Sequence, residues 1–221
     1  MLTARELLIP LLRHELRAAR TLPLYVGITC ALVVVLAPVL ALASLESAVG
    51  ATLLRMATVA AIGGMVFLMD DPAAAGTEVQ PVPRWVRQAL RAVLGLVLFV
   101  PFWVVSASVV KTTVNSTTGE PLPVTDLAVE AGILMVICCA LVLFGLKRSG
   151  GTSGSSVAAP GLAVLILVLI ALPDDAALYT DPASDGWAAA RQRWQWLGGA
   201  ALALCGLQAW MRRPGYASLW R

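Results

Sequence analysis

Long apolar runs separated by short polar segments dominate the pattern of the 221-residue chain. About 20 consecutive apolar residues are enough for a helix to cross the hydrocarbon core of a bilayer. Six such runs predict six transmembrane helices, over about 22–44, 51–69, 90–110, 127–146, 157–172 and 194–211. The predicted fold class is therefore an all-α integral membrane protein that forms a single domain over 1–221.

Composition separates this pattern from a large soluble core. The sequence is 59% hydrophobic and 13% charged, with a mean hydropathy of +0.82, whereas soluble domains carry about 25% charged residues. Its four cysteines all lie inside apolar runs, without the spacing of a metal site or a disulfide framework. We therefore expect packing roles for the cysteines, no metal site, and a chain embedded in lipid.

The distribution of positive charge predicts how the helices are oriented. Short loops on the cytoplasmic side of a membrane collect Lys and Arg. With the N-terminus inside, 12 of the 16 Lys and Arg residues fall on the cytoplasmic side, and only Lys111, Arg191 and Arg193 lie in or beside outer loops. The sequence thus predicts a multi-pass membrane protein with both termini in the cytoplasm.

A polar, amphipathic segment precedes the first apolar run. Thr3 and Glu6 form a capping-box pattern, in which each side chain satisfies a backbone N–H at a helix start. Arginines then recur at helical spacing beside a row of leucines, which predicts an interfacial amphipathic helix over 1–21. Pro10 would kink or restart this helix. The alternative is a simple positive leader for the first span.

A polar segment over 70–89 interrupts the chain between the second and third spans. Asp71 followed by Pro72 has the pattern of an N-cap and a first helical residue. Pro81 and Pro83 then predict an extended strut, because the residue before each proline is disfavoured in the α region. The segment reads as a short acidic helix held off the membrane. The alternative is an ordinary solvated connector.

In these features the chain resembles the small six-span permease subunits of ABC-type exporters of the actinobacterial kind. The resemblance rests on the N-terminal interfacial helix, the six spans with both ends inside, and the segment "DDPAAAGTEVQPVPRW". In such permeases the loop after the second span holds a coupling helix that docks on a separate ATP-binding subunit. The resemblance implies this coupling set: Asp70, Asp71 and Pro72 at the start of the helix, Glu78 facing the ATPase, and Pro81, Pro83 and Arg84 in the strut.

The resemblance also implies a function and partners. The chain would be the permease of an exporter in the bacterial plasma membrane, paired with a second permease copy as a homodimer or heterodimer. It lacks the GK[ST] ending of a phosphate-binding loop, so it would bind no cofactor directly, and ATP and Mg would sit on the partner subunit. The substrate would be a peptide, a lipid or an antibiotic-like molecule. We expect contact with lipid, no binding of nucleic acid and no enzymatic activity of its own.

Two other classes compete with this interpretation. A non-transporting membrane scaffold or regulatory protein could bind a soluble partner through the same 70–89 loop. A membrane enzyme is disfavoured, because the chain has a single histidine, His14, and no nucleophile motif.

Arg55 and Glu130 are the only charges clearly inside the predicted spans, since Arg91 lies at the very start of the third span. A charge inside a bilayer is costly, at about 2.5 to 3.5 kcal/mol at mid-depth, and is a functional candidate by default. Their similar depth would let them pair across two spans. The alternative is that each side chain snorkels to the outer head groups.

Small residues and aromatic residues complete the predictions. Gly64 belongs to one small-residue stripe, and Gly199, Ala203 and Gly206 form another, which predicts close helix packing within one subunit or between two. The Gly/Ser-rich segment after Arg148 is predicted to be a flexible connector. The second part of the last outer loop is predicted to form a short amphipathic helix, and Trp187, Trp194 and Trp196 to lie in an outer aromatic belt.

Overall fold

The computed structural model describes residues 21–42, 45–70, 84–117, 121–173 and 176–210, and these residues contain helices and no strand. The prediction of an all-α fold is confirmed for this part of the chain. The elements, in chain order, are α2 (Thr21–Ala41), α3 (Ser47–Met65), the 3₁₀ turn η1 (Val66–Met69), α4 (Arg84–Thr117), α5 (Val124–Arg148), α6 (Ser155–Ala171) and α7 (Trp187–Trp210).

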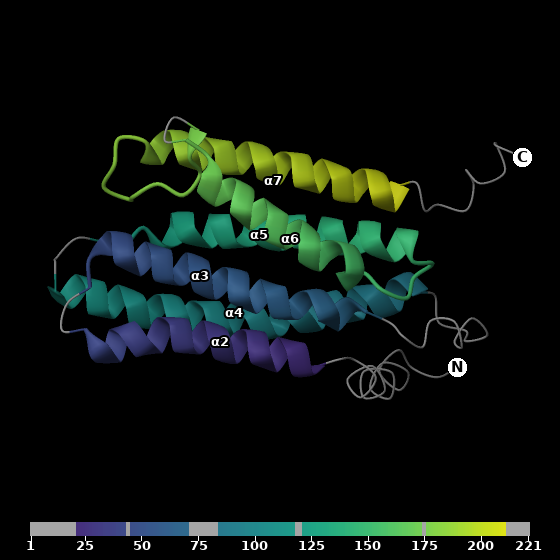
Figure 1. Cartoon of the computed structure of the whole chain (residues 1–221), viewed down its shortest axis with the longest axis horizontal. Coiled ribbons are helices and arrows are strands. Elements are labelled where there is room, and N and C mark those ends of the chain that lie inside the picture. Colours follow the sequence, from purple (N-terminus) through teal and green to yellow (C-terminus); the bar gives the residue numbers. More distant parts are fainter. Residues whose placement is uncertain (1–20, 43–44, 71–83, 118–120, 174–175, 211–221) are drawn as a thin grey trace, which may run out of the picture.

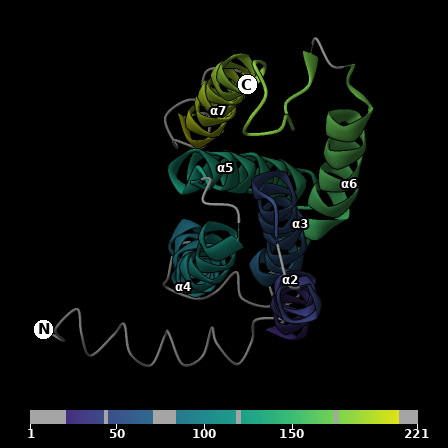
Figure 2. The same cartoon turned by 90° about the vertical axis from the view of Figure 1, so that its left-hand side faces the viewer.

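The α-helices run up and down along one long axis, and α6 crosses that axis obliquely (Figure 1). Seen along the axis, α3 and α5 occupy the centre, with α2 and α4 packed around α3 and with α6 and α7 packed around α5 (Figure 2). One end of the bundle holds η1, the starts of α2, α4 and α6, and the ends of α5 and α7. We call it the Asp70 end, and we call the opposite end the Arg55 end.

Among the described residues, four helical segments are long and apolar enough to cross a membrane: Thr21–Ala41, Ser47–Met69, Val86–Val114 and Val124–Arg148. The apolar helix α6 is shorter, at 17 residues, and α7 carries Arg191 and Arg193 in its first two turns. The spans predicted over 157–172 and 194–211 therefore form helices, while their crossing of the bilayer remains a prediction.

Helices α2 and α3 approach each other closely through two glycines. A Cβ atom added to Gly64 would lie 2.7 Å from the carbonyl oxygen of Pro23, and one added to Gly27 would lie 2.7 Å from the carbonyl oxygen of Ala60. No side chain fits at such distances, so only glycine permits this contact. Gly64 therefore lies where the backbones of α2 and α3 come closest together.

The second small-residue stripe behaves differently. Gly199, Ala203 and Gly206 are exposed on α7, and a Cβ atom at either glycine would meet nothing within 4 Å among the described residues. The glycine that faces a neighbour is Gly198, where a Cβ atom would lie 2.9 Å from Ile133 of α5. One residue turns a helix by about 100°, so this stripe points away from α5 and does not pack within the described chain.

The turn between α5 and α6 is hydrogen-bonded, and the prediction of a flexible connector does not fit it. Gly150 and Gly151 have φ values of 66° and 97°, which L side chains rarely adopt. The N–H of Gly151 donates to the carbonyl of Leu146 at 2.7 Å, and the N–H of Ser153 donates to Ser149 Oγ at 3.0 Å. The glycines thus end α5 with a tight left-handed turn.

Several predictions fall outside the described residues. These are the interfacial helix predicted over 1–21, apart from Thr21, which begins α2, and the part of the coupling set formed by Asp71, Pro72, Glu78, Pro81 and Pro83. The strut residue Arg84 is the first residue of α4.

Candidate functional site

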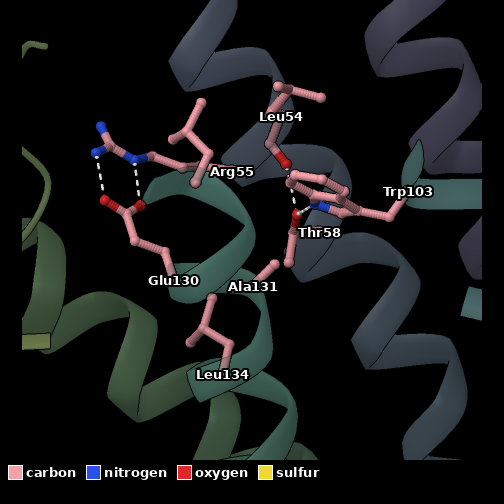
Figure 3. A pocket seen from close by; sticks show the side chains of 8 residues that line it. Leu54, Arg55, Thr58, Trp103, Glu130, Ala131 and Leu134 are labelled. Carbon is pink, nitrogen blue, oxygen red and sulfur yellow. Dashed lines mark hydrogen bonds and ion pairs between the residues drawn. The ribbon is translucent and has the colours of Figure 1, made fainter. Parts of the chain in front are cut away.

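Arg55 of α3 and Glu130 of α5 form a two-pronged ion pair near the Arg55 end (Figure 3). Arg55 Nε donates to Glu130 Oε2 at 2.8 Å, and Nη2 donates to Oε1 at 2.9 Å. The side chains are only 10% and 8% exposed. Two parallel hydrogen bonds fix both position and orientation, so the pair links the two central helices. The sequence allowed either pairing or snorkelling of these two side chains, and in the structure they are paired.

The third contact of Arg55 brings in the segment between α6 and α7. Arg55 Nη1 donates to the carbonyl of Thr180 at 3.0 Å. Its guanidinium lies 5.0 Å from the ring centre of Tyr179 and 5.5 Å from that of Trp187, within the range of cation–π attraction. Arg55 is therefore the point at which α3, α5, the 176–186 segment and α7 meet.

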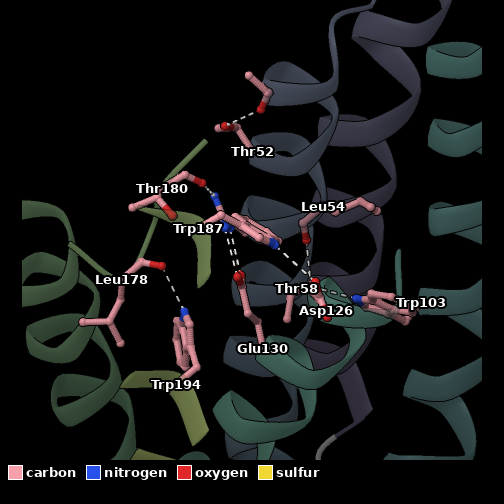
Figure 4. A network of polar contacts seen from close by, with 12 residues as sticks. Thr52, Leu54, Thr58, Trp103, Asp126, Glu130, Leu178, Thr180, Trp187 and Trp194 are labelled. Carbon is pink, nitrogen blue, oxygen red and sulfur yellow. Dashed lines mark hydrogen bonds and ion pairs between the residues drawn. The ribbon is translucent and has the colours of Figure 1, made fainter. Parts of the chain in front are cut away.

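Indole N–H groups hold the same region together (Figure 4). Trp187 Nε1 donates to Asp126 Oδ2 at 3.1 Å, and Trp194 Nε1 donates to the carbonyl of Leu178 at 3.1 Å. Trp194 is fully buried, and its ring centre lies 5.6 Å from that of Tyr179. The prediction that Trp194 lies in an aromatic belt is wrong, because its indole reaches a backbone carbonyl inside the bundle.

Two further predictions for the outer side concern residues of α7. Trp196 is 73% exposed, as a residue in an outer belt would be. The predicted short amphipathic helix of the outer loop is the start of α7, which continues from Trp187 without a break. Arg191 lies in these first turns and pairs with Asp126 at 3.2 Å, an exposed contact that contributes little to stability.

Behind the ion pair lies a void of about 10 Å³, enclosed in part by Arg55, Glu130, Thr58 and Trp103 (Figure 3). Trp103 Nε1 donates to Thr58 Oγ1 at 3.1 Å, and that hydroxyl donates to the carbonyl of Leu54 at 2.7 Å. The void has about the volume that one water molecule needs. Together, the ion pair and these two hydrogen bonds form a row of polar contacts from α5 through α3 to α4.

A larger cavity of about 620 Å³ lies on the other side of Arg55, between α3 and α6. We call it the lateral groove. Its walls come from α2, α3, α6 and the segment before α7: Val34; Ala48, Thr52, Arg55, Met56, Val59 and Ala60; Ile166 and Ile170; Tyr179, Thr180 and Asp181. Its volume falls in the range of about 300–1,000 Å³ that is usual for small-molecule sites.

Burial changes the acid–base chemistry at the wall of this groove. Desolvation raises the pKa of Tyr179 above the usual value of a tyrosine, the negative charge of Glu130 raises it further, and Arg55 opposes both. Tyr179 Oη is also buried without a hydrogen-bond partner among the described residues. Tyr179 therefore contributes a neutral ring beside the ion pair.

At the opposite end, Asp70 connects three elements. It follows η1 and is 5% exposed. Its carboxylate accepts hydrogen bonds from the backbone N–H groups of Gly154 and Ser155 at 2.8 and 2.9 Å, and from the Ser155 hydroxyl. Its carbonyl accepts one from Arg91 Nη1 of α4. Asp70 thus caps the start of α6 from 84 residues away.

The residues of the coupling set therefore do not all lie on a surface that is open to a partner. Its first member, Asp70, is buried and bonded within the chain, whereas the resemblance implied that it begins a helix facing a partner. The sequence predicted a helix start at Asp71 and Pro72, and its local pattern did not indicate that Asp70 caps a different helix. An indirect signal was that Gly154, the residue before α6, has no side chain with which to cap that helix.

Comparison with known families, with characterised proteins and with solved structures finds no match to this chain. The class of protein consequently rests on the fold itself. The described residues form an all-helical bundle of the kind found in membrane proteins, with four helices long and apolar enough to cross a bilayer, a buried ion pair at one end and a buried aspartate cap at the other.

Proposed function

We propose that the chain is the membrane-spanning permease subunit of an ABC exporter, with a separate subunit that binds ATP and Mg. The Asp70 end would face the cytoplasm of a bacterial cell. Arg87, Arg91, Lys147 and Arg148 all belong to helix termini at this end, as expected for the cytoplasmic side. Both termini would then be cytoplasmic, because α2 begins and α7 ends there (Figure 1).

The observation that carries the proposal is the position of Asp70 directly before the segment 71–83. A partner that moves this segment would pull on Asp70, which is bonded to the start of α6 and to Arg91 of α4. Helix α6 in turn forms one wall of the lateral groove. A movement at the cytoplasmic surface would therefore reach the groove through a short chain of buried contacts.

This arrangement suggests how ATP hydrolysis would drive export. Two permease copies would work with two ATPase subunits, and closure of the ATPases on ATP would displace the segment 71–83 of each copy. Because α6 is tied at its start, displacement of Asp70 would change the angle of α6 against α3. The groove would widen or close at the Arg55 end, and substrate would be released outward.

Co-expression with a nucleotide-binding protein, sought among the reading frames beside this gene, tests the proposal. The purified complex in nanodiscs should hydrolyse MgATP. The triple variant Asp71→Ala, Pro72→Ala, Glu78→Ala should lose most of the bound ATPase while it inserts and purifies normally. Glu46→Ala is the control, because Glu46 is exposed at the Arg55 end and should leave association unchanged.

Retention of the ATPase at parental level by the triple variant would contradict the coupling role of this segment. Association of a partner that hydrolyses no ATP would favour the alternative, a membrane scaffold or regulatory protein that binds through the same loop.

A further inference from the structure

The lateral groove has the shape and polarity of a site for a molecule drawn from the membrane. Its α3 residues, from Ala48 to Ala60, recur every three or four positions and so lie along one side of the helix. Twelve residues of helix span about 18 Å, slightly more than half of the roughly 30 Å hydrocarbon core. The groove is therefore long enough to hold an extended hydrocarbon chain within one leaflet.

The side of the groove is open toward the surface of the bundle. Met56 and Ile170, on opposite rims, are 55% and 70% exposed. Helix α6 is fastened at the Asp70 end by the Asp70 cap and runs obliquely past the central helices (Figure 1). A membrane-embedded molecule could therefore enter from the side, between α3 and α6.

Polar groups gather at the Arg55 end of the groove, and the inner end is apolar. Thr52, Thr180 and Asp181 lie toward the Arg55 end, whereas Val59 and Ala60 of α3 and Ile166 of α6 line the deeper part. Thr180 Oγ1 is buried without a hydrogen-bond partner among the described residues. Buried hydroxyls are normally hydrogen-bonded, so a polar ligand group or a water is expected beside it. This gradient matches an amphiphile with its head at the membrane surface.

The charges at the polar end decide the chemistry of the head group. Arg55 is neutralised by Glu130 through two hydrogen bonds. Asp181 has no ion-pair partner among the described residues, and its carboxylate accepts a hydrogen bond from the backbone N–H of Ala183 at 3.0 Å. The three charges sum to one negative charge, which favours a cationic head group over an anionic one.

We propose that the lateral groove binds an amphiphile with a hydrocarbon tail and an amine head group. The tail lies along α3 between Thr52 and Ala60, and the ammonium lies beside Asp181 and Thr180. The proposal that such an amphiphile binds depends only on the groove. The further proposal that it is the exported substrate rests on the proposed permease function.

Photo-crosslinking of the full chain in nanodiscs of phosphatidylglycerol tests where the amphiphile binds. The probe is dodecylamine with a photoreactive diazirine in its tail. Mass spectrometry of the cross-linked peptides should place the label on the groove side of α3 and on Ile166 or Ile170 of α6. Unlabelled dodecylamine should compete for these positions better than dodecanoic acid. Labelling spread evenly around the bundle would overturn the proposal.

Two pairs of variants test the contacts. Val59→Trp fills the groove and should abolish labelling at α3 and α6, while Val105→Trp, at a valine 57% exposed on α4, should not. Asp181→Asn should weaken dodecylamine binding by roughly two- to five-fold, the size of a partly exposed ion pair. Asp185→Asn, in the same segment and also exposed, should leave it unchanged. Equal effects of Asp181→Asn and Asp185→Asn would refute the head-group assignment.

The complex with the ATPase separates this proposal from the proposed function. Competitive labelling of the groove together with dodecylamine-stimulated ATP hydrolysis supports both. Labelling without any associated ATPase keeps the binding site and overturns the permease function. ATPase association without competitive labelling keeps the permease and overturns the binding site.

Discussion

At the scale of single residues, Arg55 shows how a costly charge is accommodated among apolar helices. Its guanidinium has five N–H donors, and three of them have partners in Glu130 and Thr180. Two aromatic rings lie against it. The charge is therefore satisfied inside the protein, and Arg55 does not need to reach the head groups.

This account predicts strong coupling between Arg55 and Glu130. Glu130→Gln and Arg55→Gln should each lower the free energy of unfolding, because each leaves a buried charge without its partner. The double variant should cost less than the sum, with a coupling energy of about 0.5 to 3 kcal/mol. Unfolding in detergent measures the four free energies. Strictly additive losses would instead support two independent, snorkelling side chains.

Tyr179 gives a prediction for high pH. The folded chain holds the pKa of Tyr179 above its usual value, through burial first and the charge of Glu130 second. Above a pH of about 10 the unfolded chain releases this proton while the folded chain retains it, so stability falls as pH rises further. Tyr179→Phe should remove that part of the fall and cost little near neutral pH, because the hydroxyl has no partner among the described residues. Thermal unfolding against pH checks this, and identical alkaline slopes for both proteins would contradict it.

At the scale of elements, the apolar runs were sufficient to predict the helices but not which helices and loops contact each other. Each of the six predicted runs falls on a helix, although α4 extends from Arg84 to Thr117, well beyond the apolar stretch that predicted it. Pairings such as Asp70 with α6, and Trp194 with Leu178, depend on tertiary approach. Local periodicity carries no information about them, so the buried cap and the buried indole could not be predicted.

The packing of α2 on α3 can be tested with adjacent glycines. A Cβ atom at Gly64 would meet the Pro23 carbonyl at 2.7 Å, whereas one at Gly63 would meet nothing within 4 Å among the described residues. Gly64→Ala should therefore lower the free energy of unfolding by about 1–3 kcal/mol through overpacking. Gly63→Ala should raise it by up to about 1 kcal/mol, since alanine favours helix. Equal responses of the two variants would show that α2 does not approach α3 at Gly64.

At the scale of the whole molecule, the two ends have different chemistry. The Asp70 end carries the aspartate cap and most of the arginines that lie near the ends of the described helices. The Arg55 end carries the ion pair, the indole contacts and the groove.

The proposed function requires the Asp70 end to be cytoplasmic. Cysteines at Ser116 and Ala183 should then react with an impermeant reagent in intact cells, and cysteines at Gly76 and Ser153 should not. Reaction at position 76 would reverse the orientation and remove the basis of the coupling segment.

The central claim is that a movement of the cytoplasmic segment reaches the groove through Asp70. Spin labels at Met56 and Ile170, on the two rims of the groove, report the distance between α3 and α6. In the complex with the ATPase subunit, the account predicts that ATP changes this distance distribution in the parent and leaves it unchanged in Asp70→Asn with Ser155→Ala, a variant that weakens the cap by about 0.5 to 2 kcal/mol. A distribution that is the same with and without ATP in the parent, or that shifts equally in the variant, would contradict it.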